Sequence, residues 1–310
     1  MLKKILLCAA LCVFYPFVSV RAATPARLDT LGVSARHGDE DDRSGDGLKR
    51  YKVHVTSTPG SLEVRSSRQA AESVRGLVQN QSGDNSLLDI GVLGGADFDG
   101  TWFRKVAEQG DPEAQFVVGF MYAKGCGVSK SFREAAVWFR KAAEQGEPNA
   151  QRELAYLYMV GEGVSRSFRE AAWWLTKAAD QGDAMAQFRL GKMYEMGEGV
   201  PHSSREAVKW FHKSALQGNA MAQCDLGYMY FNGQGVAENP AEALKWFTLA
   251  SAQGDPIAQL NLGCFYQFGI GVPADEYMAA KWYRKSAMQG NEHARRALKR
   301  LRMFIFSAQK

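Results

Sequence analysis

The sequence predicts an all-α protein, a right-handed α-solenoid of stacked helical hairpins with a period of 36 residues. Tryptophan recurs every 36 residues with no insertion, and glycine recurs with the same spacing, both singly and as Gly-x-Gly pairs. Each unit therefore holds two helix-length segments separated by glycine. A single helical hairpin cannot bury its apolar side alone, so neighbouring units must stack around one continuous core. The tryptophans in register are Trp102, Trp138, Trp174, Trp210, Trp246 and Trp282.

Residues 1–22 have the pattern of a cleavable signal peptide. Lys3 and Lys4 form a basic start, residues 5–18 form an apolar run, and Val20 and Ala22 occupy the −3 and −1 positions of a cleavage site. A membrane anchor is the alternative, but this run is shorter than the roughly 20 residues that span a bilayer. We therefore expect an exported protein, periplasmic or secreted, with no membrane insertion after the signal is removed.

Residues 23–97 differ in composition from the rest of the chain. Gly, Ser, Asp and Arg dominate, and residues 39–42 form an acidic cluster. Such a segment buries too little apolar surface to offset the entropy of ordering. We expect a low-complexity, disordered N-terminal segment, with a short amphipathic helix over 62–78 as an alternative.

The helical units follow from residue 98. In the first complete unit, Asp111 followed by Pro112 predicts a helix start, and this helix ends at Gly125. The second helix is expected over residues 131–145, and it stops at Gly146, a residue type that readily adopts the left-handed conformation beyond a helix end. We expect the array to cover 98–304, including a C-terminal capping helix, with residues 305–310 as a tail.

Both ends of the array depart from the repeat. Asp99 and Gly100 stand where the second helices of later units have alanine, which predicts that the second-type helix at the start of the array is frayed. Near the other end, Lys299 replaces a small residue and Arg302 replaces a tyrosine of the preceding unit. These changes turn a packing face into surface, as a terminal cap requires.

The formal charge of +5 is concentrated at the C-terminal end. Residues 291–310 contain six Lys and Arg residues against one acid, Glu292, so this segment accounts for the whole excess. A solvated, basic capping helix explains this distribution better than a phosphate-binding surface does. We expect no nucleic-acid partner.

The recurring residues resemble those of the Sel1-like repeat family, which is related to the tetratricopeptide repeat. The first helix reads Ala-Gln-x-x-Leu-Gly-x-x-Tyr-x-x-Gly-x-Gly-Val in residues 186–200, and the second carries Ala-x-x-Trp-Phe and Ala-x-x-Gly in residues 207–218. The resemblance covers residues 98–304. It implies an α-solenoid used as a scaffold or adaptor, often in exported bacterial proteins, and it names no ligand.

The first helix of each unit has a recurring face and a variable face. Counted from the capping residue, positions 4, 5, 8, 9, 11 and 12 recur and should pack, whereas positions 3, 6, 7, 10, 13 and 14 vary between units. First helices usually line the concave surface of a solenoid, so the variable positions are expected to face a ligand. Aromatic residues and Met beside charges are typical of a recognition surface. The candidate partner-binding residues are Phe116, Phe120, Arg152, Tyr156, Phe188, Arg189, Lys192, Tyr228 and Phe231.

No pattern of catalytic or metal-ligating residues is found in the sequence. The five histidines lack metal-ligand spacing, and the Gly-x-Gly pairs are helix terminators rather than phosphate loops. Removal of the signal peptide leaves Cys126, Cys224 and Cys264, an odd number of small, semi-buried thiols. We expect no metal, no cofactor and no enzymatic activity.

One enzymatic alternative comes from cysteine-rich bacterial relatives that are described as penicillin-binding or β-lactamase-like. That resemblance requires paired cysteines in each unit, which this sequence lacks. Its only Ser-x-x-Lys is residues 307–310, at the end of the chain, where no rigid element orients a base or an oxyanion site.

These observations predict an exported, non-enzymatic scaffold that binds a protein or peptide on its concave face. An envelope regulatory protein and a host-directed virulence factor of the same fold are alternatives that the sequence does not separate. The sequence carries no signal for an oligomeric state.

Overall fold

A computed structural model of the chain describes residues 101–308, with side chains over 103–301. The predicted signal peptide, the segment 23–97 and the side chain of Trp102 lie outside the described residues. Every regular element within them is a helix. The first helices of the hairpins are α5 (Pro112–Lys124), α7 (Pro148–Val160), α9 (Ala184–Met196), α11 (Ala220–Asn232) and α13 (Pro256–Phe268). The second helices are α6 (Phe132–Glu144), α8 (Phe168–Asp180), α10 (Ser204–Leu216), α12 (Pro240–Ala252) and α14 (Glu276–Met288), and α4 (Thr101–Glu108) and α15 (Glu292–Ala308) flank them.

The helix ends are capped as the sequence predicts. The carboxylate of Asp111 accepts a hydrogen bond from the Ala114 amide at 2.7 Å, which caps α5. At the other end, Gly125 adopts a left-handed conformation with φ of +79°. Ser131 caps α6 by accepting from the Glu134 amide. This pattern recurs in each hairpin, so the unit boundaries follow directly from the repeated capping residues.

The second glycine of three Gly-x-Gly pairs, at Gly163, Gly199 and Gly235, has a role that the sequence did not reveal. A Cβ atom on Gly163 would lie 2.2 Å from the carbonyl oxygen of Phe132, in the preceding hairpin. Gly163 therefore allows its loop to contact the start of the previous second helix, in addition to the helix termination at Gly161.

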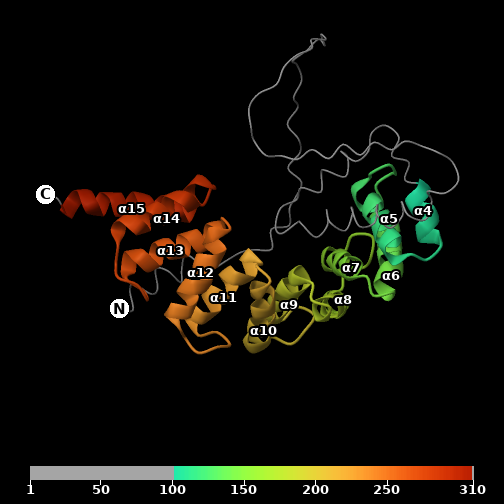
Figure 1. The fold of residues 1–310 in the computed structure, drawn as a ribbon, viewed down its shortest axis with the longest axis horizontal. Helices are drawn as coiled ribbons and strands as arrows, with labels where there is room; N and C mark the ends of the chain where they lie inside the picture. Colours follow the sequence, from blue (N-terminus) through green and yellow to red (C-terminus); the bar gives the residue numbers. More distant parts are fainter. Residues whose placement is uncertain (1–100, 309–310) are drawn as a thin grey trace, which may run out of the picture.

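Each helix packs against the helix before it and the helix after it along the chain. The described helices follow one curved path from α4 to α15, and α7 and α9 lie on the side toward which the array curves (Figure 1). Buried residues form successive clusters along this path, beginning with Phe103 and ending with Leu301. The fold is an α-solenoid.

A row of glutamines joins neighbouring hairpins. Gln187 of α9 is buried and donates from Nε2 to the Ala179 carbonyl of α8 at 3.0 Å. Its Oε1 accepts from Nε2 of Gln217, which follows α10, at 2.8 Å. Each buried glutamine thus links three consecutive helices. The same acceptor and donor pairs are Gln115–Gln145, Gln151–Gln181, Gln223–Gln253 and Gln259–Gln289.

The last described helix differs in length from the internal helices. Helix α15 has 17 residues, whereas α14 has 13. Helix α15 continues to Ala308, beyond the end expected at residue 304. None of the helices in the described part of the chain is both long and apolar enough to cross a membrane.

Candidate partner-binding surface

All nine candidate residues lie on first helices, between α5 and α11. They differ widely in exposure. Phe116 and Phe120 are buried, Tyr156 is 39% exposed, and the other candidates are half-buried. The expectation that the variable positions lie outside the packing is therefore wrong for Phe116 and Phe120. Met159, another residue of the variable sector, is buried as well.

The physical reason is that aromatic rings of this sector pack against aromatic rings of neighbouring helices. The ring of Phe116 lies 5.8 Å from that of Phe139, and the ring of Phe188 lies 5.9 Å from that of Phe211. Phe231 reaches forward instead, with its ring 5.3 Å from that of Phe265 in the next unit. These rings contribute to packing, although Phe188 and Phe231 keep some exposure.

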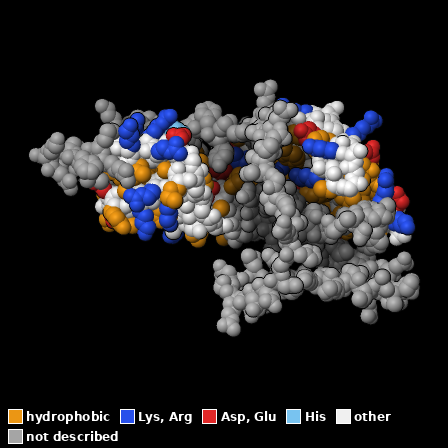
Figure 2. Space-filling model, turned by 90° about the horizontal axis from the view of Figure 1, so that it is seen from above, with side chains coloured by type: hydrophobic (Ala, Val, Ile, Leu, Met, Phe, Trp, Pro, Cys, Tyr) orange, Lys and Arg blue, Asp and Glu red, His pale blue; other side chains and the backbone are white. Residues whose placement is uncertain are grey.

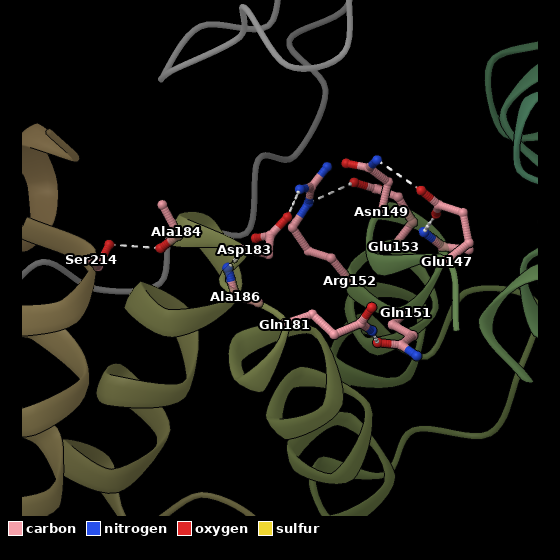
Figure 3. Close-up of polar contacts among 11 residues, drawn as sticks. Glu147, Asn149, Gln151, Arg152, Glu153, Gln181, Asp183, Ala184, Ala186 and Ser214 are labelled. Carbon is pink, nitrogen blue, oxygen red and sulfur yellow. Dashed lines mark hydrogen bonds and ion pairs between the residues drawn. The ribbon is translucent and has the colours of Figure 1, made fainter. Parts of the chain in front are cut away.

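The charged candidates form links between adjacent units. Arg152 of α7 pairs with Asp183, the capping residue of α9, and also contacts Glu153 at 3.4 Å. Figure 3 shows Arg152, Glu153 and Asp183 on one side of the two helices, with the Gln151–Gln181 pair beneath them. Burial alone would lower the pKa of the Arg152 guanidinium, but the carboxylates of Glu153 and Asp183 raise it overall.

Position 10 of one unit meets position 7 of the next at two successive steps of the array. The guanidinium of Arg189 lies over the ring of Tyr156, 5.3 Å from its centroid. One unit further along, Nζ of Lys192 lies 3.4 Å from the carboxylate of Asp225 and also contacts Glu195. The two pairs make one continuous row of side chains across α7, α9 and α11.

Burial shifts the pKa values of two side chains in this row, Arg189 and Asp225. It lowers the pKa of the Arg189 guanidinium. Burial also raises the pKa of Asp225 to about 6, although the nearby Lys192 acts in the opposite direction. The side chains of Lys192 and Asp225 are 17% and 29% exposed, and this partial burial makes an electrostatic contact with a ligand stronger than it is on an open surface.

Two exposed apolar residues extend the row and were not among the candidates. Val160 and Met196 are each 41% exposed and occupy position 14 of successive units. Val160 lies one turn after Tyr156 on α7, so the two side chains share a face. We define the central surface as Tyr156, Val160, Arg189 and Met196. The repeat spacing of Val160 and Met196 was the signal that could have identified them.

The described residues contain no group of three or more His, Cys, Asp and Glu side chains placed to hold a metal ion. Cys126 is half-buried, and Cys224 and Cys264 are buried. The hydroxyl of Tyr283 lies 3.3 Å from Sγ of Cys264. What the described surface offers is packing area, hydrogen-bond donors and charge.

The capped helical hairpins, the glutamine row and the curved path together define a helical-repeat protein of the solenoid class. The chain belongs to the Sel1 repeat family. The sequence model of that family matches five consecutive segments, residues 112–147, 148–183, 184–219, 220–255 and 256–291. No curated protein matches the chain.

Two solved structures are similar over most of the array. One is c5321 of uropathogenic Escherichia coli, described as a protective antigen with an SLR fold, at 39% identity and a TM-score of 0.62. The match covers 64% of this chain and 42% of that one, so the chain spans less than half of the antigen's length. The other is a Sel1 repeat protein from Oxalobacter formigenes at 35% identity and a TM-score of 0.61, covering 70% of this chain and 87% of that one.

Proposed function

We propose that the chain is an exported, non-enzymatic scaffold that binds a protein or peptide along its first helices, centred on the central surface of α7 and α9. The observation that carries this proposal is the exposure of Tyr156, Val160 and Met196 beside Arg189. Exposed apolar side chains next to charged groups are typical of interfaces.

The arrangement of Arg189 supports recognition of a polar chain. Its guanidinium has five N–H donors and lies against the ring of Tyr156. Arg152 and Lys192, by contrast, are engaged by neighbouring carboxylates. Arg189 can therefore donate to the carbonyl or carboxylate oxygens of a bound segment while Tyr156, Val160 and Met196 contact its apolar side chains.

A host-directed or envelope role of the same scaffold is the second candidate. The observation that favours it is the similarity to a protein described as a protective antigen in uropathogenic Escherichia coli.

A displayed library of random peptides, selected on the purified array, tests the main proposal. Selected peptides should lose about 30-fold in affinity when Tyr156 is replaced by alanine, because central aromatic residues carry about 2 kcal/mol or more of an interface. Arg189→Ala should also lower the affinity of the selected peptides.

Trp173 is the matched control. It is an aromatic residue on α8 with 51% exposure, and it lies on a second helix. Trp173→Ala should leave the affinity unchanged. If Trp173→Ala abolishes binding while Tyr156→Ala and Arg189→Ala do not, the second helices bind the partner and the proposal is wrong.

A further inference from the structure

The outward face of α14 differs from that of the other second helices. Tyr277, Lys281, Arg284 and Met288 follow one another at intervals of three or four residues, so they form a stripe along one side of the helix. All four are exposed, with Tyr277 at 78% and Met288 at 82%. Lys285 lies beside this stripe and is exposed too.

Among the described residues, the cations of this stripe form no ion pair, unlike the lysines at the same place in α10 and α12. In α10, Lys209 pairs with Glu206 at 2.6 Å, and in α12 Lys245 pairs with Glu242. The corresponding position in α14 is Met278, at the same spacing before Lys281. The substitution removes a negative charge where the repeat otherwise keeps one.

Helix α15 adds further positive charge at the same end of the array. Arg295, Arg296, Lys299 and Arg300 are exposed, and among the described side chains of this helix only Arg295 has an ion pair, with Glu292. Figure 2 shows Lys and Arg side chains gathered over the end of the molecule formed by α14 and α15. Helix α15 packs against α14, so the two sets of cations belong to one end of the array.

We propose that this C-terminal end is a peripheral docking surface for an anionic lipid bilayer, separate from the central surface. Clustered Lys and Arg residues are attracted to anionic headgroups with about 1 kcal/mol each. Tyr277 and Met288 bracket the cations of α14, and such side chains partition into the interface between water and lipid. Nucleic acid is the other polyanion that cations attract, but two exposed apolar side chains at either end of the stripe favour lipid.

Co-sedimentation with vesicles tests the proposal. The chain from residue 23 is used, because the apolar residues 5–18 would themselves enter bilayers. It should bind vesicles of phosphatidylcholine mixed with phosphatidylglycerol and not vesicles of phosphatidylcholine alone. Raising the ionic strength from about 0.05 M to about 0.5 M should release it, since the attraction is screened.

The charge-reversal variant K281E/R284E/K285E should lower the partition coefficient at least about 100-fold, which corresponds to about 1 kcal/mol for each lost cation. Its control is R133E/R169E/R205E, which changes the net charge equally at exposed residues of α6, α8 and α10. The control should keep most of the binding. Circular dichroism checks that both variants retain their helices.

Four results would overturn the proposal. The first is no binding to anionic vesicles at low salt, and the second is an equal loss in the control variant, which would reflect net charge alone. The third concerns the apolar residues: Tyr277→Ser with Met288→Ser should weaken vesicle binding several-fold and leave binding of a short DNA duplex unchanged. If the double variant binds vesicles as before, or, as the fourth result, if the duplex binds more tightly than the vesicles, the surface does not recognise lipid.

Discussion

Gly191 of α9 lies against the ring of Phe211 of α10, and a Cβ atom on Gly191 would be 2.6 Å from Cδ1 of that ring. The same relationship joins Gly119 to Phe139, Gly227 to Phe247 and Gly263 to Tyr283. The second unit has Ala155 at the glycine position and Leu175 at the aromatic position, both buried. The size of one residue therefore complements the size of the other across each hairpin.

Replacing Gly191 with leucine should destabilise the protein by about 1–3 kcal/mol, because the new side chain must displace the Phe211 ring. Urea unfolding measures the change. An unaltered unfolding midpoint would show that Gly191 does not face the second helix.

The second unit suggests a double variant that tests this complementarity. Gly191→Ala with Phe211→Leu recreates the Ala155–Leu175 pair, so the double variant should be more stable than the sum of the two single changes predicts. Strict additivity in this double-mutant cycle would contradict the proposed complementarity.

The glutamine row should also contribute to stability. Gln187→Leu removes the side-chain donor to the Ala179 carbonyl, which still accepts from the Gly182 amide, and it leaves Gln217 without its acceptor. Two hydrogen bonds are lost, so we expect a loss of about 1–3 kcal/mol. Gln217 is exposed, so water can replace it as a donor to Gln187. Gln217→Ala should therefore cost less than about 1 kcal/mol, and equal losses in the two variants would be inconsistent with this explanation.

The sequence predicted the fold almost completely and the surface only in part. Periodic Trp and Gly, together with capping residues such as Asp111 and Ser131, specify where each helix begins and ends, and these are local signals. Which side chains of the first helices are exposed is not determined by the local sequence. Whether Phe116 or Phe188 faces outward depends on how close the second helix brings the ring of Phe139 or Phe211, which a helical wheel does not represent.

The sequence could not predict the contacts between units for a related reason. Tyr156 and Arg189, and likewise Lys192 and Asp225, come together because one unit stacks on the next. The offset between position 10 and position 7 depends on how the hairpins are rotated against each other. Only the structure gives that rotation.

Asp225 should make stability depend on pH. Its pKa in the folded protein is raised from 3.8 to about 6, first by burial and then by the carboxylates of Glu195 and Asp255, against the effect of Lys192. Because the folded state holds this proton more tightly, the carboxyl group lowers stability progressively as the pH rises from about 4 to about 6. Asp225→Asn should therefore gain stability over the wild type across this range, by at most about 3 kcal/mol above pH 6. Melting curves from pH 4 to pH 8 measure it, and a stability difference that does not change with pH would contradict the prediction.

Purified protein should not hydrolyse β-lactams. The only Ser-x-x-Lys of the sequence is residues 307–310, and a serine nucleophile needs an oriented base and oxyanion donors on rigid elements. Nitrocefin turnover that disappears with Ser307→Ala would reverse this expectation. Turnover that persists in that variant would point to a different nucleophile and equally contradict the non-enzymatic function.

The last prediction separates binding from packing on the first helices. Phe188 lies against Phe211 and Phe231 lies against Phe265, so alanine at either position should lower stability by about 1–3 kcal/mol, less than the loss for a fully buried phenylalanine. Tyr194 packs against the core clusters from the recurring face, and its truncation should have a similar effect on stability. Tyr156 is more exposed than these residues, so Tyr156→Ala should change the melting temperature little and reduce peptide binding instead. Melting curves and peptide affinities are measured for all four variants. If Tyr156→Ala unfolds the protein as readily as Phe188→Ala does, Tyr156 is part of the packing and the partner binds elsewhere.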